Sequence, residues 1–343
     1  MKKIFLIGYY GFKNYGDDLL FKTLTKIFEE IDFKGKIVIP AEELPEYNSN
    51  NNFFIEKINR YDILSINHHI KSSDLIIYGG GNLFQTETSL KSFLYYYHIA
   101  KQAIKNNKKI LFLSQGFGPI KNKVAKPKLK KIVNYENLIG VYRDDTSYKY
   151  ANNFNERSYL GVDIGPYYFN DTPIKKKNKI SLCLKNEYYD IKNLINFLSV
   201  FNDYEVSTLV INSNQDAIMN YYMVEEIREK TDLNAVFPFK DFDKIIEEIK
   251  SSKIVISDRL HSSITAAYFE SNFFTYNSSK NKRVLKTIDN SYDFFYKDLM
   301  DIPFLFSEKE AKNYNFKEYG EIYKKKLEET IIMTKEIIQN ALS

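Results

Sequence analysis

An arginine and a histidine flank a single leucine at the point where a short apolar run meets a predicted helix. The segment reads "SDRLHSSITAAYF" (257–269) and follows "KIVIS". Arginine and histidine at a helix N-terminus suit an anionic ligand, because the unbonded amide N–H groups and the positive end of the helix dipole favour negative charge there. The structural alternative is a buried pair of Arg259 with Asp258, beside a packed His261. We expect Arg259 and His261 to serve a ligand site.

Three glycine-rich loops follow predicted strands of the N-terminal half: "GYYGFKNYGDD" (8–18), "YGGGNLF" (78–84) and "SQGFGP" (114–119). Glycine lets a backbone turn sharply and approach a ligand closely. The spacing matches neither the dinucleotide fingerprint nor the P-loop, and each loop alone could be a plain turn. Together they predict a binding wall, whose candidate residues are Gly11, Asn14, Gly16, Asp17, Gly80, Gly81, Asn82, Gln115, Gly116 and Gly118.

Two further cations also follow predicted strands. Arg143 begins "RDDTS" (143–147), and two interpretations stay open: it faces the ligand or it pairs with Asp144 or Asp145. Lys280 follows "FFTYNSS" in the C-terminal half. We expect Lys280 to join Arg259 and His261 in a cleft that the glycine loops also line.

The elements that must position these residues are short apolar strands alternating with longer helical stretches. This pattern predicts parallel sheets covered on both faces. The predicted strands are 3–8, 36–40, 75–79, 109–114 and 138–143, then 180–185, 207–212, 234–237, 253–257 and 273–277. The predicted helices are 17–31, 60–73, 88–106, 125–134 and 144–153, then 190–202, 215–231, 241–251, 259–270 and 318–342.

The alternation stops once and restarts, which predicts two α/β domains with Rossmann-like doubly wound parallel sheets and an interdomain cleft. The stretch 166–179, with two prolines and a lysine run, is the predicted linker. We place an N-terminal domain at 1–170, a C-terminal domain at 178–312 and a closing helix at 313–343. Residues 41–58 are polar, and we expect an irregular surface excursion there.

Composition narrows the function classes. The 343 residues are 44% hydrophobic and carry a net charge of +5, which suits anionic small ligands and does not indicate a dedicated nucleic-acid binder. The single Cys183 excludes an internal disulfide framework and indicates a reducing compartment. The apolar N-terminus reads as a first strand and not a signal peptide, and no stretch reaches the length of a membrane span. We expect a cytoplasmic protein without metal or cofactor.

A lysine-rich stretch, "KNKVAKPKLKK" (121–131), holds six lysines in eleven residues. A solvated face is the usual interpretation. Docking to anionic lipid, which would place the protein peripherally at the inner membrane face, is the alternative.

The ordered set of motifs resembles the polysaccharide pyruvyl transferases, which include ketal-pyruvyl transferases of bacterial cell-wall and exopolysaccharides. The resemblance rests on "GYYGFKNYGDDLL", "YGGGNLF", "SQGFGP", "VYRDDTS", "GVDIG", "SDRLHSSITAAY" and the lysine of "YNSSK". Asp18 stands where the family usually has glutamate, and Lys185 where it often has arginine. The resemblance implies a GT-B-like architecture of two Rossmann-like domains.

The resemblance also implies an activity: transfer of the enolpyruvyl unit of phosphoenolpyruvate to a sugar, closing a pyruvate ketal with release of phosphate. His261 would transfer protons, because histidine does so near neutral pH. Arg259 and Lys280 would hold the phosphate or carboxylate of phosphoenolpyruvate. The implied acceptor is a sugar, a glycan or a lipid-linked oligosaccharide. A GT-B glycosyltransferase that uses a nucleotide sugar, and a non-catalytic glycan-binding relative, remain the alternatives.

Overall fold

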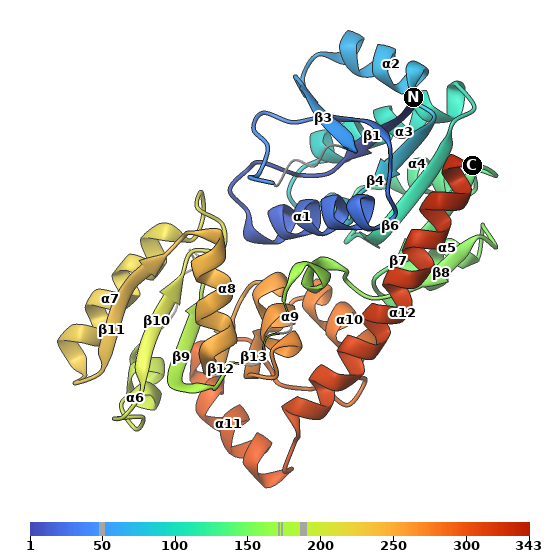
Figure 1. Cartoon of the computed structure of the whole chain (residues 1–343). Helices are drawn as coiled ribbons and strands as arrows, with labels where there is room; N and C mark the ends of the chain where they lie inside the picture. Colours follow the sequence, from blue (N-terminus) through green and yellow to red (C-terminus); the bar gives the residue numbers. More distant parts are fainter. Residues whose placement is uncertain (48–51, 171, 173, 186–190) are drawn as a thin grey trace. The chain divides into compact units, whose positions relative to one another are not determined.

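The computed structural model describes residues 1–47, 52–170, 172, 174–185 and 191–343. They divide into two units (Figure 1). Unit 1 consists of Met1–Phe12, Asp17–Tyr168 and Lys326–Ser343, and unit 2 consists of Lys13–Gly16 and Phe169–Lys325. Each unit therefore draws on parts of the chain that are far apart in sequence.

Unit 1 is built on a parallel sheet with the strand order β3-β2-β1-β4-β6-β7-β8, and β5 pairs with β6 beside this path. The strands are β1 (Lys2–Ile7), β2 (Gly35–Pro40), β3 (Phe53–Ile58), β4 (Leu75–Tyr78), β5 (Gly81–Phe84), β6 (Lys109–Phe117), β7 (Leu138–Tyr142) and β8 (Ser158–Leu160). The helices are α1 (Tyr15–Glu30), α2 (Ile63–Ser72), α3 (Leu90–Lys105), α4 (Ala125–Val133) and α5 (Asp145–Asn152), followed by a 3-10 turn (Gly165–Tyr168).

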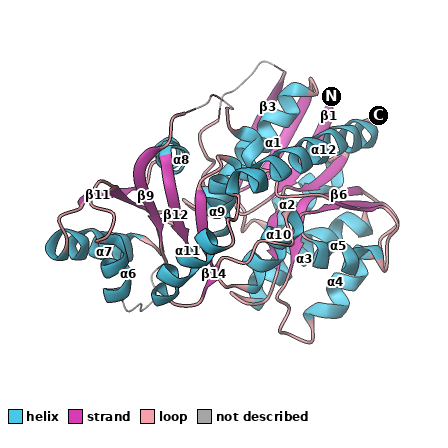
Figure 2. Cartoon of the chain, turned by 90° about the horizontal axis from the view of Figure 1, so that it is seen from below, coloured by secondary structure: helices cyan, strands magenta, loops and turns pink. Residues whose placement is uncertain are grey.

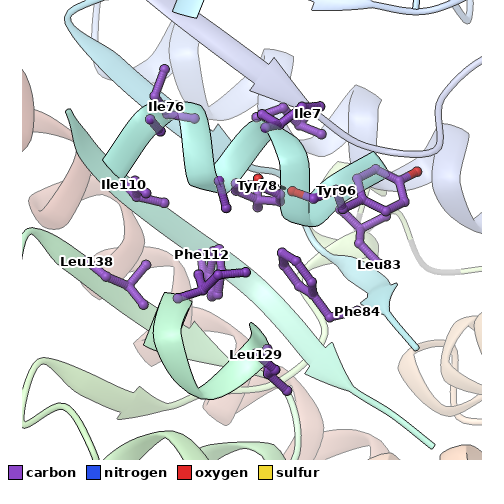
Figure 3. Packing of buried hydrophobic residues seen from close by; sticks show 14 of the residues in the cluster. Ile7, Ile76, Tyr78, Leu83, Phe84, Tyr96, Ile110, Phe112, Leu129 and Leu138 are labelled. Carbon is purple, nitrogen blue, oxygen red and sulfur yellow. Dashed lines mark hydrogen bonds between the residues drawn. The ribbon is translucent and has the colours of Figure 1, made fainter. Parts of the chain in front are cut away.

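One face of this sheet packs on α2, α3 and α4. Because successive strand residues point to opposite faces, Phe5 and Ile7 enter this core from the same side of β1. Figure 3 shows Phe112 of β6 and Phe84 of β5 side by side in this core, with Tyr96 of α3 next to Phe84. On the other face, Leu6 lies near Leu24 of α1 beside Gly79. The buried strands explain the nearly all-apolar runs in the sequence.

Unit 2 has a second parallel sheet, with the order β11-β10-β9-β12-β13-β14. Its strands are β9 (Lys177–Cys183), β10 (Glu205–Leu209), β11 (Asn234–Phe239), β12 (Ser252–Ser257), β13 (Asn272–Tyr276) and β14 (Phe295–Tyr296). Its helices are α6 (Lys192–Leu198), α7 (Ala217–Lys230), α8 (Phe242–Ser251), α9 (Leu260–Tyr268), α10 (Ser279–Ile288), a 3-10 turn (Leu299–Asp301), α11 (Ile302–Ala311) and α12 (Phe316–Leu342). Figure 2 shows the alternation of helices and strands in each unit.

The last helix, α12, contributes to both units. Its residues up to Lys325 are grouped with unit 2, where Tyr319 donates a hydrogen bond to the carbonyl of Leu285 (2.9 Å). Its residues from Lys326 on are grouped with unit 1, where the amide of Val162 donates to the hydroxyl of Thr330 (3.2 Å). The predicted closing helix is thus one continuous element shared by two cores.

The predicted fold class of two parallel-sheet α/β units is confirmed. The expectation of an irregular excursion at 41–58 is wrong for its last part, because residues 53–58 form β3, which pairs in parallel with β2. The short strands β5, β8 and β14 and the helices α10 and α11 were not predicted. Predictions that fall on 48–51, on Asp171 and Pro173 of the linker and on the helix start at 190 lie outside the described residues.

Candidate active site

The connection from β12 to α9 stands where the strand order of unit 2 reverses. β9 is flanked by β10 on one side and β12 on the other, so the chain winds outward in two directions from this pair. In open parallel sheets, such a switch point is where ligands bind, beyond the carboxyl ends of the strands. Arg259 and His261, predicted from the sequence as site residues, both occupy this connection.

Buried serines fix the backbone of this connection. Ser257 accepts a hydrogen bond from the amide of Arg259 (2.9 Å), and Ser262 donates its hydroxyl hydrogen to the carbonyl of Arg259 (2.9 Å). Arg259 is the N-cap of α9 and has an extended backbone, with φ −103° and ψ 127°. Because both of its peptide groups are held, the direction in which the arginine side chain leaves the backbone is set.

A buried aspartate from the neighbouring loop holds the guanidinium group of Arg259. Nε donates to Oδ2 of Asp216 (3.1 Å), and Nη2 donates to Oδ1 of Asp216 and to Oε1 of Gln215 (2.9 Å). Asp216 is fully buried, whereas the arginine side chain is 20% exposed. Asp216 takes one edge of the planar guanidinium and Gln215 takes the second hydrogen of Nη2, so the N–H groups of Nη1 remain for an anion.

The structural alternative of a pair between Arg259 and Asp258 is therefore not what the chain forms. Asp258 instead accepts the amide N–H of Lys185 (2.8 Å) and the hydroxyl of Tyr296 (2.7 Å). These bonds tie the ends of β9, β12 and β14 together. Asp216 was not predicted as the partner of Arg259, although it ends the polar run "INSNQD" (211–216) that follows a strand.

The short segment Lys13–Gly16 from the first glycine loop is part of this same unit. Asn14 forms an antiparallel bridge with Asn212, and the amide of Tyr15 donates to the carbonyl of Ile211 (2.9 Å). The amide of Ser213 returns a bond to the carbonyl of Lys13 (3.1 Å). Backbone hydrogen bonds thus attach this segment to the loop that follows β10.

This segment lies directly against His261. A methyl group on Gly16 would lie 1.8 Å from Nδ1 of His261, whereas nonbonded heavy atoms normally stay about 3.5 Å apart. The hydroxyl of the buried Tyr15 is hydrogen-bonded to Thr265 (2.9 Å), which in turn donates to the carbonyl of His261 (2.6 Å). Glycine at position 16 is needed because the imidazole fills the place of its side chain. Tyr15, which was not among the predicted site residues, belongs to this packing.

Lys280 lies on the same edge of the sheet. It follows β13, the strand beside β12, and stands in the first turn of α10, whose N-cap Ser278 accepts the amide of Asn281 (3.1 Å). The carboxyl ends of neighbouring parallel strands share one edge, so the cationic residues of these two connections lie at that edge. One of these cations, Arg259, is paired with the buried carboxylate of Asp216.

In unit 1, two of the predicted glycine loops brace each other. Nε2 of Gln115 donates to the carbonyl of Gly81 (3.0 Å), and Nδ2 of Asn82 donates to the carbonyl of Gly118 (2.5 Å). Gly80 and Gly81 have φ of 93° and 85°, which explains why side chains are absent there. The opposite atoms, Oε1 of Gln115 and Oδ1 of Asn82, are buried and have no hydrogen-bond partner among the described residues. These two oxygens can accept hydrogen bonds from a ligand.

Arg143 of unit 1 is buried in an ion pair. Its side chain is 2% exposed, and Nη1 lies 2.5 Å from Oδ2 of Asp163, so the interpretation as a pairing residue holds with a different aspartate from those expected. Asp163 also accepts the amide of Gly165 (3.1 Å). A methyl group on Gly116 would come within 3.2 Å of Nε of Arg143, which places this arginine just beneath the third glycine loop.

The two aspartates at the start of α1 contact different glycine loops. Oδ1 of Asp17 would lie 3.5 Å from a methyl group on Gly81, so Asp17 stands beside the second glycine loop. Asp18 accepts the amide of Gly11 (3.2 Å) and closes the first loop. Partial burial raises the pKa of the Asp18 carboxyl from 3.8 to about 6, and the bond from Gly11 opposes this shift.

The three histidines other than His261 lie on helices of unit 1. His68 and His69 are on α2, and His98 on α3 bonds to the side chain of Asn67 (3.1 Å). In the part of the chain that the structure describes, no three His, Cys, Asp or Glu side chains gather as a metal site. Cys183 is buried, which raises the pKa of its thiol. None of the described helices is both long and apolar enough to cross a bilayer.

Comparison with known families gives one match over most of the chain. Residues 14–280 match the family model described as polysaccharide pyruvyl transferase. The matched range contains the glycine loops from Asn14 onward, the Arg259–His261 connection and Lys280. No curated protein sequence matches the chain.

Solved structures similar to this chain share its fold over nearly the whole length. Sucrose-phosphate synthase from Thermosynechococcus elongatus is 8% identical at a TM-score of 0.61, covering 99% of both chains. HepE of Anabaena in complex with UDP is 9% identical at 0.61, covering 100% of this chain and 99% of that one. UDP-GlcNAc 2-epimerase from Neisseria meningitidis, bound to UDP-GlcNAc, is 10% identical at 0.59, with 100% and 99% covered. The two-unit architecture is thus GT-B-like, as the resemblance implied.

Proposed function

Since the chain belongs to the polysaccharide pyruvyl transferase family, we propose that it transfers the enolpyruvyl unit of phosphoenolpyruvate to a sugar and closes a pyruvate ketal on two hydroxyls. One observation carries this proposal. At the switch point of unit 2, Arg259 is held in place by Asp216, and two residues later His261 packs against Gly16. An anionic donor needs the first group, and the proton transfers need the second.

Arg259 binds the donor through its charge and orientation. Phosphoenolpyruvate carries a phosphate and a carboxylate, and planar guanidinium groups bind both with paired hydrogen bonds. Asp216 occupies one edge of the guanidinium and keeps the group from rotating. Lys280 adds positive charge at the next strand end, and the positive end of the α9 dipole favours an anion there.

His261 moves the protons. Protonation of the CH2 carbon of phosphoenolpyruvate makes it a methyl group and leaves an oxocarbenium-like centre at C2. A sugar hydroxyl adds to C2 and loses its proton, and a second hydroxyl then displaces phosphate and closes the ketal ring. The two sugar hydroxyls release two protons. One replaces the proton that was added to the CH2 carbon, and the other leaves with phosphate. An imidazole with a pKa near neutrality can both give and take these protons.

The donor half of the proposal is tested by binding. Phosphoenolpyruvate should raise the melting temperature of the protein and bind in calorimetry without an acceptor. Arg259→Ala should weaken this binding about tenfold to hundredfold, the range for a lost charged hydrogen bond. Arg259→Lys should recover little, since an ammonium cannot pair with Asp216 and the donor in one plane. Stabilisation by UDP, GDP or CMP sugars and none by phosphoenolpyruvate would favour a glycosyltransferase instead.

The chemical half is tested by turnover. Phosphate release from phosphoenolpyruvate, with a glycan library read by mass for the added ketal, identifies an acceptor. His261→Ala should then lower kcat by about 10²–10⁴-fold with a modest change in KM. His98→Ala is the matched control, because His98 is another partly buried histidine on a helix, in unit 1. Turnover that survives His261→Ala, or that falls equally in both variants, would contradict the assignment.

A further inference from the structure

A buried arginine in unit 1 is held by aromatic rings rather than by a carboxylate. Arg60 is 7% exposed, and its Nε and Nη1 atoms are buried without a hydrogen-bond partner among the described residues. No ion pair within the described part of the chain includes it. The Tyr96 hydroxyl also lies beside Arg60, but burying Nε and Nη1 without acceptors is costly, and native proteins seldom keep such donors without a reason. Its hydrogen-bonding capacity therefore points to a ligand that supplies acceptors.

The rings around Arg60 compensate for part of this cost. Its Cζ lies 4.6 Å from the ring centre of Phe12, 5.1 Å from that of Tyr95 and 5.7 Å from that of Tyr61. The ring of Tyr9, 5.8 Å away, stacks on Phe12 with centres 4.2 Å apart. Cation–π contact attracts the charge to the ring faces, but it satisfies no N–H group in the plane of the guanidinium. The in-plane donors are what an anion would use.

The cluster lies where unit 1 would be expected to bind a ligand. Tyr9 follows the end of β1, and Arg60 follows the end of β3, so both lie at the carboxyl edge of the parallel sheet. Two of the rings reach the surface, because Tyr9 is 37% exposed and Tyr61 is 67% exposed. The surface thus combines flat apolar rings with a buried cation behind them.

We propose that this cluster, formed by Tyr9, Phe12, Arg60, Tyr61 and Tyr95, binds an acidic carbohydrate, whose ring packs on the exposed tyrosines and whose anionic group pairs with Arg60. The inference rests on the proposed function in one respect, namely that the protein acts on a sugar acceptor. It adds that the acceptor carries a negative charge. A sugar phosphate and a sugar carboxylate both supply the oxygens that Arg60 lacks, and the two sources are separated by experiment.

The test measures binding of small probes to the full chain, without phosphoenolpyruvate. Glucose 1-phosphate, glucuronate and glucose are titrated in ligand-observed NMR. At least one acidic sugar should bind about tenfold to hundredfold more tightly than glucose, because one charged hydrogen-bonded contact has that value. Preference for the phosphate or for the carboxylate identifies the anionic group. Equal binding of all three sugars, or no binding of either acidic sugar, would overturn the proposal.

Variants separate ligand binding from a structural role. Arg60→Met replaces the charge by an apolar chain of similar length, so it should reduce the affinity for the acidic sugar to that for glucose while the melting temperature stays level or rises. Tyr61→Ala should weaken binding of every sugar. Lys57→Met, which removes an exposed charge from β3, the strand that precedes Arg60, is the matched control and should change neither the affinity nor the melting temperature. If Arg60→Met lowers the melting temperature and leaves the affinities unchanged, Arg60 is a structural residue.

The outcome is independent of the donor site. Phosphoenolpyruvate should bind Arg60→Met as well as the wild type, whereas Arg259→Ala should still bind the acidic sugar. Loss of phosphoenolpyruvate binding in Arg60→Met would overturn the acceptor assignment and make Arg60 a donor residue. Failure of phosphoenolpyruvate to bind the wild type would refute the proposed function and leave the acidic-sugar result to stand by itself.

Discussion

Replacement of Gly16 by alanine tests the contact that organises the candidate site. The new methyl group would lie 1.8 Å from Nδ1 of His261, so the imidazole must move by about 1.5 Å or more to restore a normal contact. Overpacking of this kind usually costs about 1–3 kcal/mol. Alanine otherwise favours a helix over glycine by up to about 1 kcal/mol, and Gly16 stands in the first turn of α1. We expect a net loss of stability of about 1–2 kcal/mol.

A double-mutant cycle supplies the control. In His261→Ala the obstructing ring is gone, so the same Gly16→Ala change should be neutral or stabilising. Urea unfolding of the wild type, both single variants and the double variant gives the coupling energy, which should exceed about 1 kcal/mol. The ring signals of His261 can be followed by NMR, since the chain has only four histidines. A coupling below about 0.5 kcal/mol, or an unshifted His261 signal in Gly16→Ala, would refute the packing explanation.

Three other predictions concern charge. A raised carboxyl pKa means that the folded chain holds a proton that the unfolded chain loses between pH 3.8 and about 6, so Asp18 favours folding at acid pH and opposes it above pH 6. Asp18→Asn should therefore stabilise the protein relative to wild type at pH 8 by up to about 3 kcal/mol and have little effect at pH 4; equal effects in urea melts at both pH values would contradict this. Arg143→Met leaves Asp163 buried without its cation, and should lower stability in thermal melts by about 3–5 kcal/mol, whereas a loss below about 1 kcal/mol would show that the pair is dispensable. The lysines of 121–131 are expected to form a solvated face, with equal sedimentation on anionic and neutral vesicles; salt-sensitive binding to the anionic vesicles alone would identify a lipid-docking surface.

The buried strands were predictable because their environment leaves a simple pattern. β4 and β6 are covered on both faces, so they appear in the sequence as apolar runs between polar ones. β3 is an edge strand with charged residues, Glu56 and Lys57, among its apolar ones. Its composition does not indicate a strand, and its pairing with β2 holds it in the strand conformation. An edge strand has a neighbouring strand on one side only, and in β3 Phe53 alone is buried, so the sequence of β3 resembles that of a loop.

The residues of the candidate site could be singled out from the sequence, but the contacts between them could not. Arg259 and His261 could be singled out by their position between a strand and a helix. The partner of Arg259 is Asp216 and not the adjacent Asp258, because the side chain of Asp258 turns toward Tyr296. The contact of Gly16 with His261 joins parts of the chain that share no local pattern. Spacing identifies which residues leave a strand end, but the direction of each side chain depends on packing.

The interleaving of the two units has a consequence for the order in which the chain can fold as it leaves the ribosome. Unit 1 includes residues 326–343, which are synthesised after all of unit 2. The amide of Val162 must await the hydroxyl of Thr330, and the segment 13–16 must await its backbone partners near Asn212. Domains usually fold one after another, beginning with the first to emerge, but here neither unit has all of its residues before α12 is synthesised. Unit 1 therefore stays incomplete in the nascent chain until the end of α12 is made, after all of unit 2.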